Sequence, residues 1–211
     1  MLQYMWEGRL RMLHKISSEL AGKLLKRTET AKYSQDVYIY GIELFISTLA
    51  ELIFILCMSL VFASFWEGAV FLVWFFTLRI FSGGYHAGTY RNCFLVTAGA
   101  FLSIELMTGI LVRVNYGSII YCILVFAGAY IMIHAPLLHK NHPLNQEKMI
   151  KNGKIASVIT LLQIAAADRL YVYTHRLFYI ASLTTCFAAV LMLIANIENA
   201  KEGVSRQWDS L

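Results

Sequence analysis

The stretch "IELFISTLAELIFILCMSLVFASF", residues 42–65, decides the fold class of this chain. It carries two carboxylates and no Lys or Arg. A helix of about 20 apolar residues is long enough to cross about 30 Å of hydrocarbon. Because only a helix satisfies its own backbone N–H and C=O groups in lipid, this stretch predicts a first membrane-spanning helix.

The rest of the chain repeats this pattern. Of the 211 residues, 58% are hydrophobic and 15% are charged, and the mean hydropathy is +0.59. Apolar runs follow at residues 68–81, 93–112, 117–134, 155–171 and 177–197. The run at 68–81 is marginal in length, so it could be tilted or re-entrant. The sequence therefore predicts an all-α, polytopic integral membrane protein with about six transmembrane or re-entrant helices.

The N-terminal segment differs from these runs. Its apolar residues recur at helical spacing, with basic residues on or beside the other face, and it lacks the apolar core and cleavage site of a signal peptide. This pattern predicts an amphipathic helix in the membrane interface, although a solvated helix packed on the protein's own loops is an open alternative. The expected domains are a basic N-terminal segment (1–40), a transmembrane domain (41–198) and a cytoplasmic tail (199–211).

The distribution of positive charge predicts the orientation. Fifteen of the 18 Lys and Arg lie in residues 1–40, from the end of the second run to the start of the third (Arg79 and Arg91), in residues 135–154 and in the tail. Cytoplasmic loops of membrane proteins carry an excess of Lys and Arg. Six spans would therefore place both termini, and the segment between the second and third runs, in the cytoplasm. A re-entrant second run would overturn this topology.

The segment "RIFSGGYHAGTYRNC", Arg79 to Cys93, is too polar for an ordinary span. A thiolate is a far better nucleophile than a thiol, and a base or a positive neighbour favours it. His86 could be the base. Arg91 and the expected N-terminal helix turn at Cys93 supply positive surroundings. The alternative is that Cys93 is only a small packing residue.

A hydrogen bond between His86 and Cys93 requires a break in the helix. Positions seven apart in one helix share a face but lie about 10 Å apart along the axis. Gly88 could supply the break, and Gly83 with Gly84 lets the backbone turn or approach a substrate closely. A backbone amide near Cys93 could stabilise the oxyanion of an acyl-transfer intermediate.

This segment resembles the core motif of the accessory gene regulator B (AgrB) family. These are bacterial membrane cysteine endopeptidases that mature quorum-sensing peptides, a process linked to virulence regulation. The basic N-terminus and the later "APLLHKNHPLN" stretch also look like that family. The resemblance implies that Cys93 is the nucleophile, that His86 is its base, and that other motif positions support function or bind substrate. Those positions are Arg79, Ser82, Gly83, Gly84, Arg91 and Lys140.

The resemblance also implies a reaction and a partner. The partner is a short precursor peptide with an acidic C-terminal tail, which would be cleaved through a Cys93 acyl-enzyme and closed into a thiolactone or lactone ring. Lys140, Lys148 and Lys151, with the two arginines of the motif, would form a basic rim that binds this tail. The expected location is the bacterial cell membrane, among lipids. A homodimer is an open expectation, and a nucleic-acid partner is not expected.

Other polar residues leave alternatives open. Carboxylates inside spans either orient His86 or pair structurally with Arg169, Arg79 or hydroxyls. A non-enzymatic transporter or assembly subunit, with those carboxylates lining a path, is the main competing function, and a metal-dependent hydrolase is a third. No metal or cofactor is expected, because the loop histidines do not follow a known zinc spacing. The carboxylates are Glu43, Glu51, Glu105 and Asp168, and the histidines are His134, His139 and His142.

Overall fold

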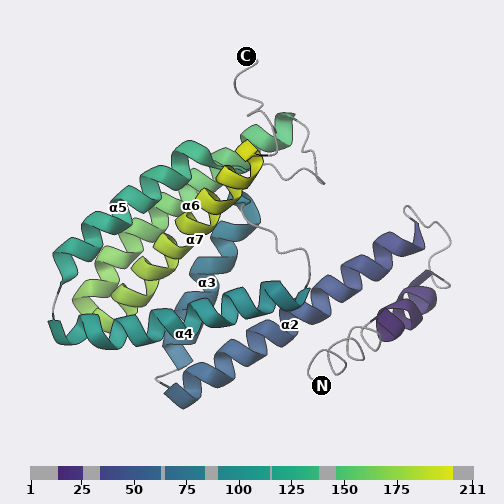
Figure 1. The fold of residues 1–211 in the computed structure, drawn as a ribbon, viewed down its shortest axis with the longest axis horizontal. Coiled ribbons are helices and arrows are strands. Elements are labelled where there is room, and N and C mark those ends of the chain that lie inside the picture. The colour runs from purple at the N-terminus through teal and green to yellow at the C-terminus, as the bar shows by residue number, and fades with distance from the viewer. Residues whose placement is uncertain are drawn as a thin grey trace. The chain divides into compact units, whose positions relative to one another are not determined.

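The computed structural model describes residues 14–25, 34–62, 65–83, 90–114, 116–137 and 146–201. Six labelled helices run through these residues, and each is long and apolar enough to cross a membrane (Figure 1). The described residues contain no β-strand beyond one isolated bridge. The predicted all-α membrane fold is therefore confirmed. The helices are α2 (Gln35–Phe62), α3 (Phe65–Ser82), α4 (Tyr90–Val114), α5 (Gly117–His134), α6 (Gln146–Tyr173) and α7 (His175–Lys201).

Helix α3 is longer than the apolar run from which the sequence predicts it. It has 18 residues, or about 27 Å at 1.5 Å per residue, which suits a full crossing. The run looked shorter in the sequence because Glu67 interrupts it near its start. In the structure Glu67 is a buried residue within the first turn of α3, so the carboxylate does not end the helix.

The chain divides into two compact units, Met1–Phe54 and Ile55–Leu211. In the first unit, residues 14–25 are helical, as the sequence predicts for part of the N-terminal segment. His14 Nδ1 lies 2.8 Å from Glu43 Oε1 and joins this helix to α2. The earlier part of the amphipathic pattern lies outside the described residues, and the domain limits at 40 and 198 stay predictions.

Helix α7 is the centre of the second unit. Of its membrane-length window 61% is buried, against 39% or less for each other helix. It packs against α3, α4, α5 and α6, and α5, α6 and α7 run side by side in Figure 1. Ala181, Ala188 and Ala189 are buried on α7, and small side chains of this kind let helix backbones approach closely.

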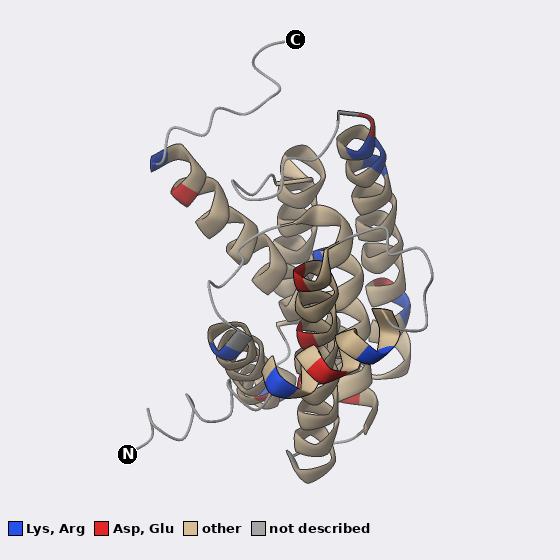
Figure 2. Cartoon of the chain, turned by 90° about the vertical axis from the view of Figure 1, so that its right-hand side faces the viewer, with Lys and Arg blue, Asp and Glu red and all other residues tan. Residues whose placement is uncertain are grey.

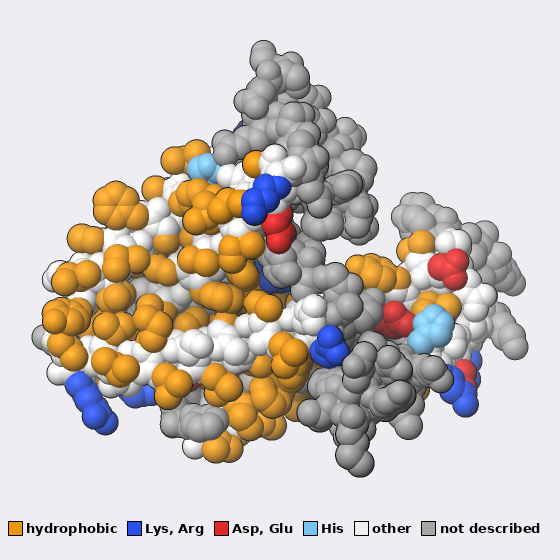
Figure 3. Space-filling model, in the orientation of Figure 1, with side chains coloured by type: hydrophobic (Ala, Val, Ile, Leu, Met, Phe, Trp, Pro, Cys, Tyr) orange, Lys and Arg blue, Asp and Glu red, His pale blue; other side chains and the backbone are white. Residues whose placement is uncertain are grey.

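The surface of the second unit is apolar, as a membrane requires. Figure 3 shows hydrophobic side chains covering the visible face over α5, α6 and α7. Large residues such as Phe126 and Ile133 of α5 and Leu162 of α6 are exposed. Figure 2 shows long stretches of helix without Lys, Arg, Asp or Glu. The protein is therefore a multi-pass membrane protein.

Aromatic side chains fix α3 against its neighbours. The Phe71 ring lies 5.2 Å from that of Phe101 on α4, and the Phe75 ring lies 6.0 Å from that of Phe187 on α7. Gln163 on α6 adds a polar tie, because its amide donates hydrogen bonds to the Trp74 carbonyl and the Thr77 hydroxyl. These contacts join α3 to α4, α6 and α7. They therefore fix the position of the helix that leads to the candidate site.

Candidate active site

The candidate site begins where α3 ends. Ser82 is the last residue of α3, and Gly83 follows with φ +69°. This left-handed conformation at the end of a helix is one that glycine adopts without steric cost. Gly83 thereby ends α3 and turns the chain toward the segment that leads to α4.

A second segment is fixed against this turn. Leu137 N–H donates a 2.9 Å hydrogen bond to the Ser82 carbonyl, and Leu137 pairs with Gly83 in an isolated parallel bridge. A Cβ on Gly83 would lie 2.5 Å from the Leu137 carbonyl oxygen. A Cβ on Gly153 of α6 would similarly lie 3.1 Å from the Ala135 carbonyl oxygen. The segment 135–137, which follows α5, is thus held between the end of α3 and the start of α6.

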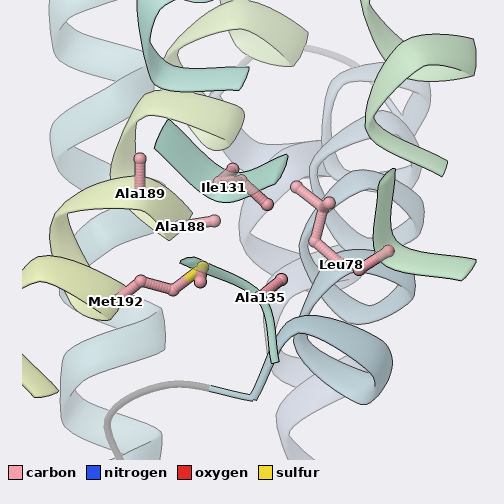
Figure 4. Close-up of a cluster of buried hydrophobic side chains, with 7 residues drawn as sticks. Leu78, Ile131, Ala135, Ala188, Ala189 and Met192 are labelled. Atoms are coloured by element: carbon pink, nitrogen blue, oxygen red, sulfur yellow. The ribbon is translucent and has the colours of Figure 1, made fainter. Parts of the chain in front are cut away.

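A cluster of buried apolar residues lies beneath this junction. Figure 4 shows Leu78 from α3, Ile131 from α5 and Met192 from α7 around Ala135. Phe81 and Leu137 pack against the same cluster. The core therefore links the end of α3, the segment 135–137 and the central helix α7.

Arg79 and Cys93, a cation and the candidate nucleophile of the motif, lie close together at this end of the bundle. Arg79 lies one turn before the end of α3, and Cys93 lies in the first turn of α4. The Arg79 guanidinium donates toward the Cys93 sulfur at 3.7 Å, and its carbon lies 5.4 Å from the centre of the Phe75 ring. Cys93 is half-buried. A guanidinium beside a half-buried sulfur stabilises the negative charge of a thiolate.

The other predicted site residues have different surroundings. Ser82 is buried, and its hydroxyl donates to the Gly83 carbonyl at 3.2 Å. Arg91 is exposed on the first turn of α4. His86, Gly84 and Lys140 lie outside the described residues, together with His139 and His142. The pairing of His86 with Cys93 therefore stays a prediction.

A group of charged residues that the sequence did not predict lies near the other end of α3. Arg176 of α7 binds Glu67 through its Nε at 2.6 Å and reaches Glu105 of α4 at 3.3 Å. The expectation that Glu105 pairs with an arginine is right in kind, but the partner is Arg176 rather than Arg169 or Arg79. The sequence showed Glu67 at the start of an apolar run and Glu105 inside a span, but it did not indicate their shared partner, because Arg176 lies 109 positions from Glu67.

His134, the last residue of α5, contacts Tyr130 one turn earlier. Its Nδ1 lies 3.0 Å from the Tyr130 carbonyl oxygen, and its ring stacks on the Tyr130 ring at 4.1 Å. Within the described ranges, no three or more His, Cys, Asp or Glu residues gather in a way that could hold a metal ion.

The fold and the site define a class: a six-span helical membrane protein with an arginine-paired cysteine where two spans meet. The family model for Accessory gene regulator B matches residues 14–198, and the chain belongs to this family. It is also similar to a curated relative from Clostridium perfringens, AgrB-like protein 2. The two are 28% identical over 154 residues, which cover 70% of this chain and 71% of the relative. No solved structure matches the chain. Membership supports a role in quorum sensing through the processing of autoinducing peptides.

Proposed function

We propose that this protein is a membrane cysteine endopeptidase that removes the C-terminal tail of a short signal precursor and promotes ring closure of the remainder. The observation that carries the proposal is the 3.7 Å contact between the Arg79 guanidinium and the Cys93 sulfur. Membership of the AgrB family supports it, as does the position of Cys93 in the first helical turn of α4, where the positive end of the helix dipole favours an anion.

In the first step, the Cys93 thiolate attacks the carbonyl carbon before the tail. The proton of the thiol passes to His86, which returns it to the leaving amine of the tail. The peptide C–N bond breaks, a C–S bond forms, and the precursor remains bound as a thioester. Arg79 stabilises the thiolate before the attack, and half-burial of Cys93 limits the access of water to the thioester.

In the second step, a thiol or hydroxyl of the precursor attacks the thioester carbonyl. The new C–S or C–O bond closes a thiolactone or lactone, Cys93 leaves as a thiolate, and His86 accepts the proton of the attacking thiol or hydroxyl. Exchange of one thioester for another is nearly balanced in free energy, so the exclusion of water decides whether ring closure outcompetes hydrolysis. We also place both termini and this site on the cytoplasmic side, on the basis of the positive charge in the connecting segments.

Intact-mass analysis of the reconstituted protein tests this proposal. After exposure to a synthetic precursor, the wild-type protein should gain the mass of the precursor without its tail, and free tail should appear in equal amount. His86→Ala should show little adduct. Precursor that binds without any adduct or released tail would contradict the enzymatic proposal and favour a binding or transport role.

Replacing Arg79 should slow every reaction of the Cys93 thiolate. A hydrogen bond to a charged group contributes about 1.5–3 kcal/mol. Arg79→Gln should therefore reduce the rate of Cys93 alkylation by iodoacetamide by about 10- to 100-fold, measured by mass mapping of the peptide that contains Cys93. Arg113→Gln, at the other end of α4, is the matched control and should react as the wild type does. Slower cleavage with unchanged alkylation would instead assign Arg79 to substrate binding.

Reversing charge on α6 tests how the precursor is recognised. Lys148 and Lys151 are exposed in the first turns of α6, the helix that follows the connection carrying Lys140. If they attract an acidic tail, Lys148→Glu with Lys151→Glu should raise KM several-fold, and the effect should fade as salt is added. Lys23→Glu, on residues 14–25, serves as the control. An unchanged KM at low salt would remove these lysines from the tail-binding site.

A further inference from the structure

The charged group formed by Glu67, Glu105 and Arg176 has more negative charge than its arginine can balance. Arg176 donates to both oxygens of Glu67, through Nε at 2.6 Å and through an Nη at 3.0 Å. The same Nη lies 3.3 Å from Glu105 Oε2, which is a longer contact. One Nη of Arg176 thus contacts an oxygen of each carboxyl group. Fully ionised, the group would carry one net negative charge inside the helix bundle.

One oxygen of this group has no partner among the residues that the structure describes. This atom is Glu105 Oε1, which is buried without a hydrogen bond, and the Glu105 residue is only 8% exposed. Thr108, one turn further along α4, is fully buried and its hydroxyl also lacks a partner. An unneutralised charge within a membrane span is costly, and two buried carboxylates around one arginine cannot both remain ionised at low cost. The group therefore lacks one positive charge.

We propose that Glu67 and Glu105 share one bound proton, which makes this group a proton-binding site inside the membrane bundle. The proton lies on one carboxyl group, whose O–H donates to the other carboxylate, and Arg176 balances the single charge that remains.

The surrounding groups do not supply this missing charge. At the same end of the bundle, the charged side chains of the described residues include Arg113 of α4, Asp168 and Arg169 of α6, and the titratable ones include Tyr171 of α6 with His175 and Tyr179 of α7. Within the part of the chain that the structure describes, none of them forms an ion pair with Glu105. His175 instead stacks on Tyr171, with ring centres 4.6 Å apart.

Glu67 and Glu105 lie on the two helices that also carry the candidate catalytic residues. Glu67 shares α3 with Arg79, and Glu105 shares α4 with Cys93. Twelve residues of helix, about 18 Å, separate the two members of each pair. The shared proton therefore completes the contact between the same two helices that carry the candidate catalytic pair, about 18 Å from the reacting sulfur.

Infrared spectroscopy of the full protein in lipid bilayers tests the proposal, because a protonated carboxyl group has a C=O band separate from that of a carboxylate. The wild type at neutral pH should show a carboxylic acid band that Glu105→Gln abolishes. Glu67→Gln should abolish the same band, since either single substitution leaves one carboxylate for one arginine. Each isosteric change keeps the volume of the site. Glu147→Gln, an exposed position on α6, is the matched control and should keep the band.

Three results would overturn the proposal. The first is the absence of any band that Glu105→Gln removes. The second is a band that survives Glu67→Gln at full strength, because Glu105 would then be protonated through burial alone. The third is loss of the wild-type band on adding sodium or potassium ions, which would make a metal cation the occupant instead of a proton.

Discussion

Cys93→Ala should abolish both release of the precursor tail and formation of the acyl adduct. Removing a covalent nucleophile typically lowers an enzyme's turnover by about 10⁶-fold. Cys93 is half-buried in the first turn of α4, where alanine is tolerated by the helix and removes only the sulfur. The protein should therefore remain folded in the membrane and still bind the precursor. Intact mass and chromatography of the released tail measure both losses.

Other cysteines provide the control for this result. Cys57 and Cys122 are exposed on α2 and α5, and Cys57→Ala and Cys122→Ala should leave tail release unchanged. Cys93→Ser keeps a hydroxyl of similar size but a far weaker nucleophile, so its activity should also fall to near background. Tail release by Cys93→Ala at the wild-type rate would exclude Cys93 as the nucleophile. If substitution of Asp168 abolishes function and substitution of Cys93 does not, the transporter alternative is favoured instead.

The sequence predicts the spans well, because the length of an apolar run is a local property. The helix at 117–134 has the predicted limits, and other helices begin earlier than their apolar runs. For α6 the difference is large, since Gln146–Tyr173 includes a polar first part that a search for apolar runs leaves out. Such a part is helical because Gln, Glu and Lys are good helix formers, although they do not favour lipid.

The sequence predicts the candidate site only in part. The sequence places Arg79 and Cys93 in one motif, but it names Arg91 as the positive neighbour of the sulfur, and the structure places Arg79 there. The contact between Gly83 and Leu137 joins two distant segments, and nothing local to either one indicates it. The contacts of Arg176 with Glu67 and Glu105 also join distant segments. Long-range contacts of this kind depend on how the helices pack, which is why the structure adds them.

The contact with Leu137 makes Gly83 the position where the smallest change should have a large effect. Gly83→Ala places a Cβ 2.5 Å from the Leu137 carbonyl oxygen, and the left-handed conformation costs a non-glycine residue about 1–2 kcal/mol. The backbone must move, and Leu137 with it, because its N–H is bonded to the Ser82 carbonyl. A misplacement of about 1 Å can cost about 10²-fold in rate. We therefore expect kcat for tail release to fall by about that factor.

Gly99→Ala is the matched control, because it adds the same methyl group to α4, the helix that carries Cys93. A Cβ at Gly99 meets nothing within 4 Å, and alanine favours the helix over glycine by about 1 kcal/mol. Gly99→Ala should therefore keep the wild-type kcat with equal or greater thermal stability in bilayers. If Gly83→Ala has the same kcat as Gly99→Ala, the segment 135–137 does not position the site. If Gly83→Ala loses kcat while Cys93 alkylation stays at the wild-type rate, the junction acts by placing the precursor against a sulfur that is still activated by Arg79.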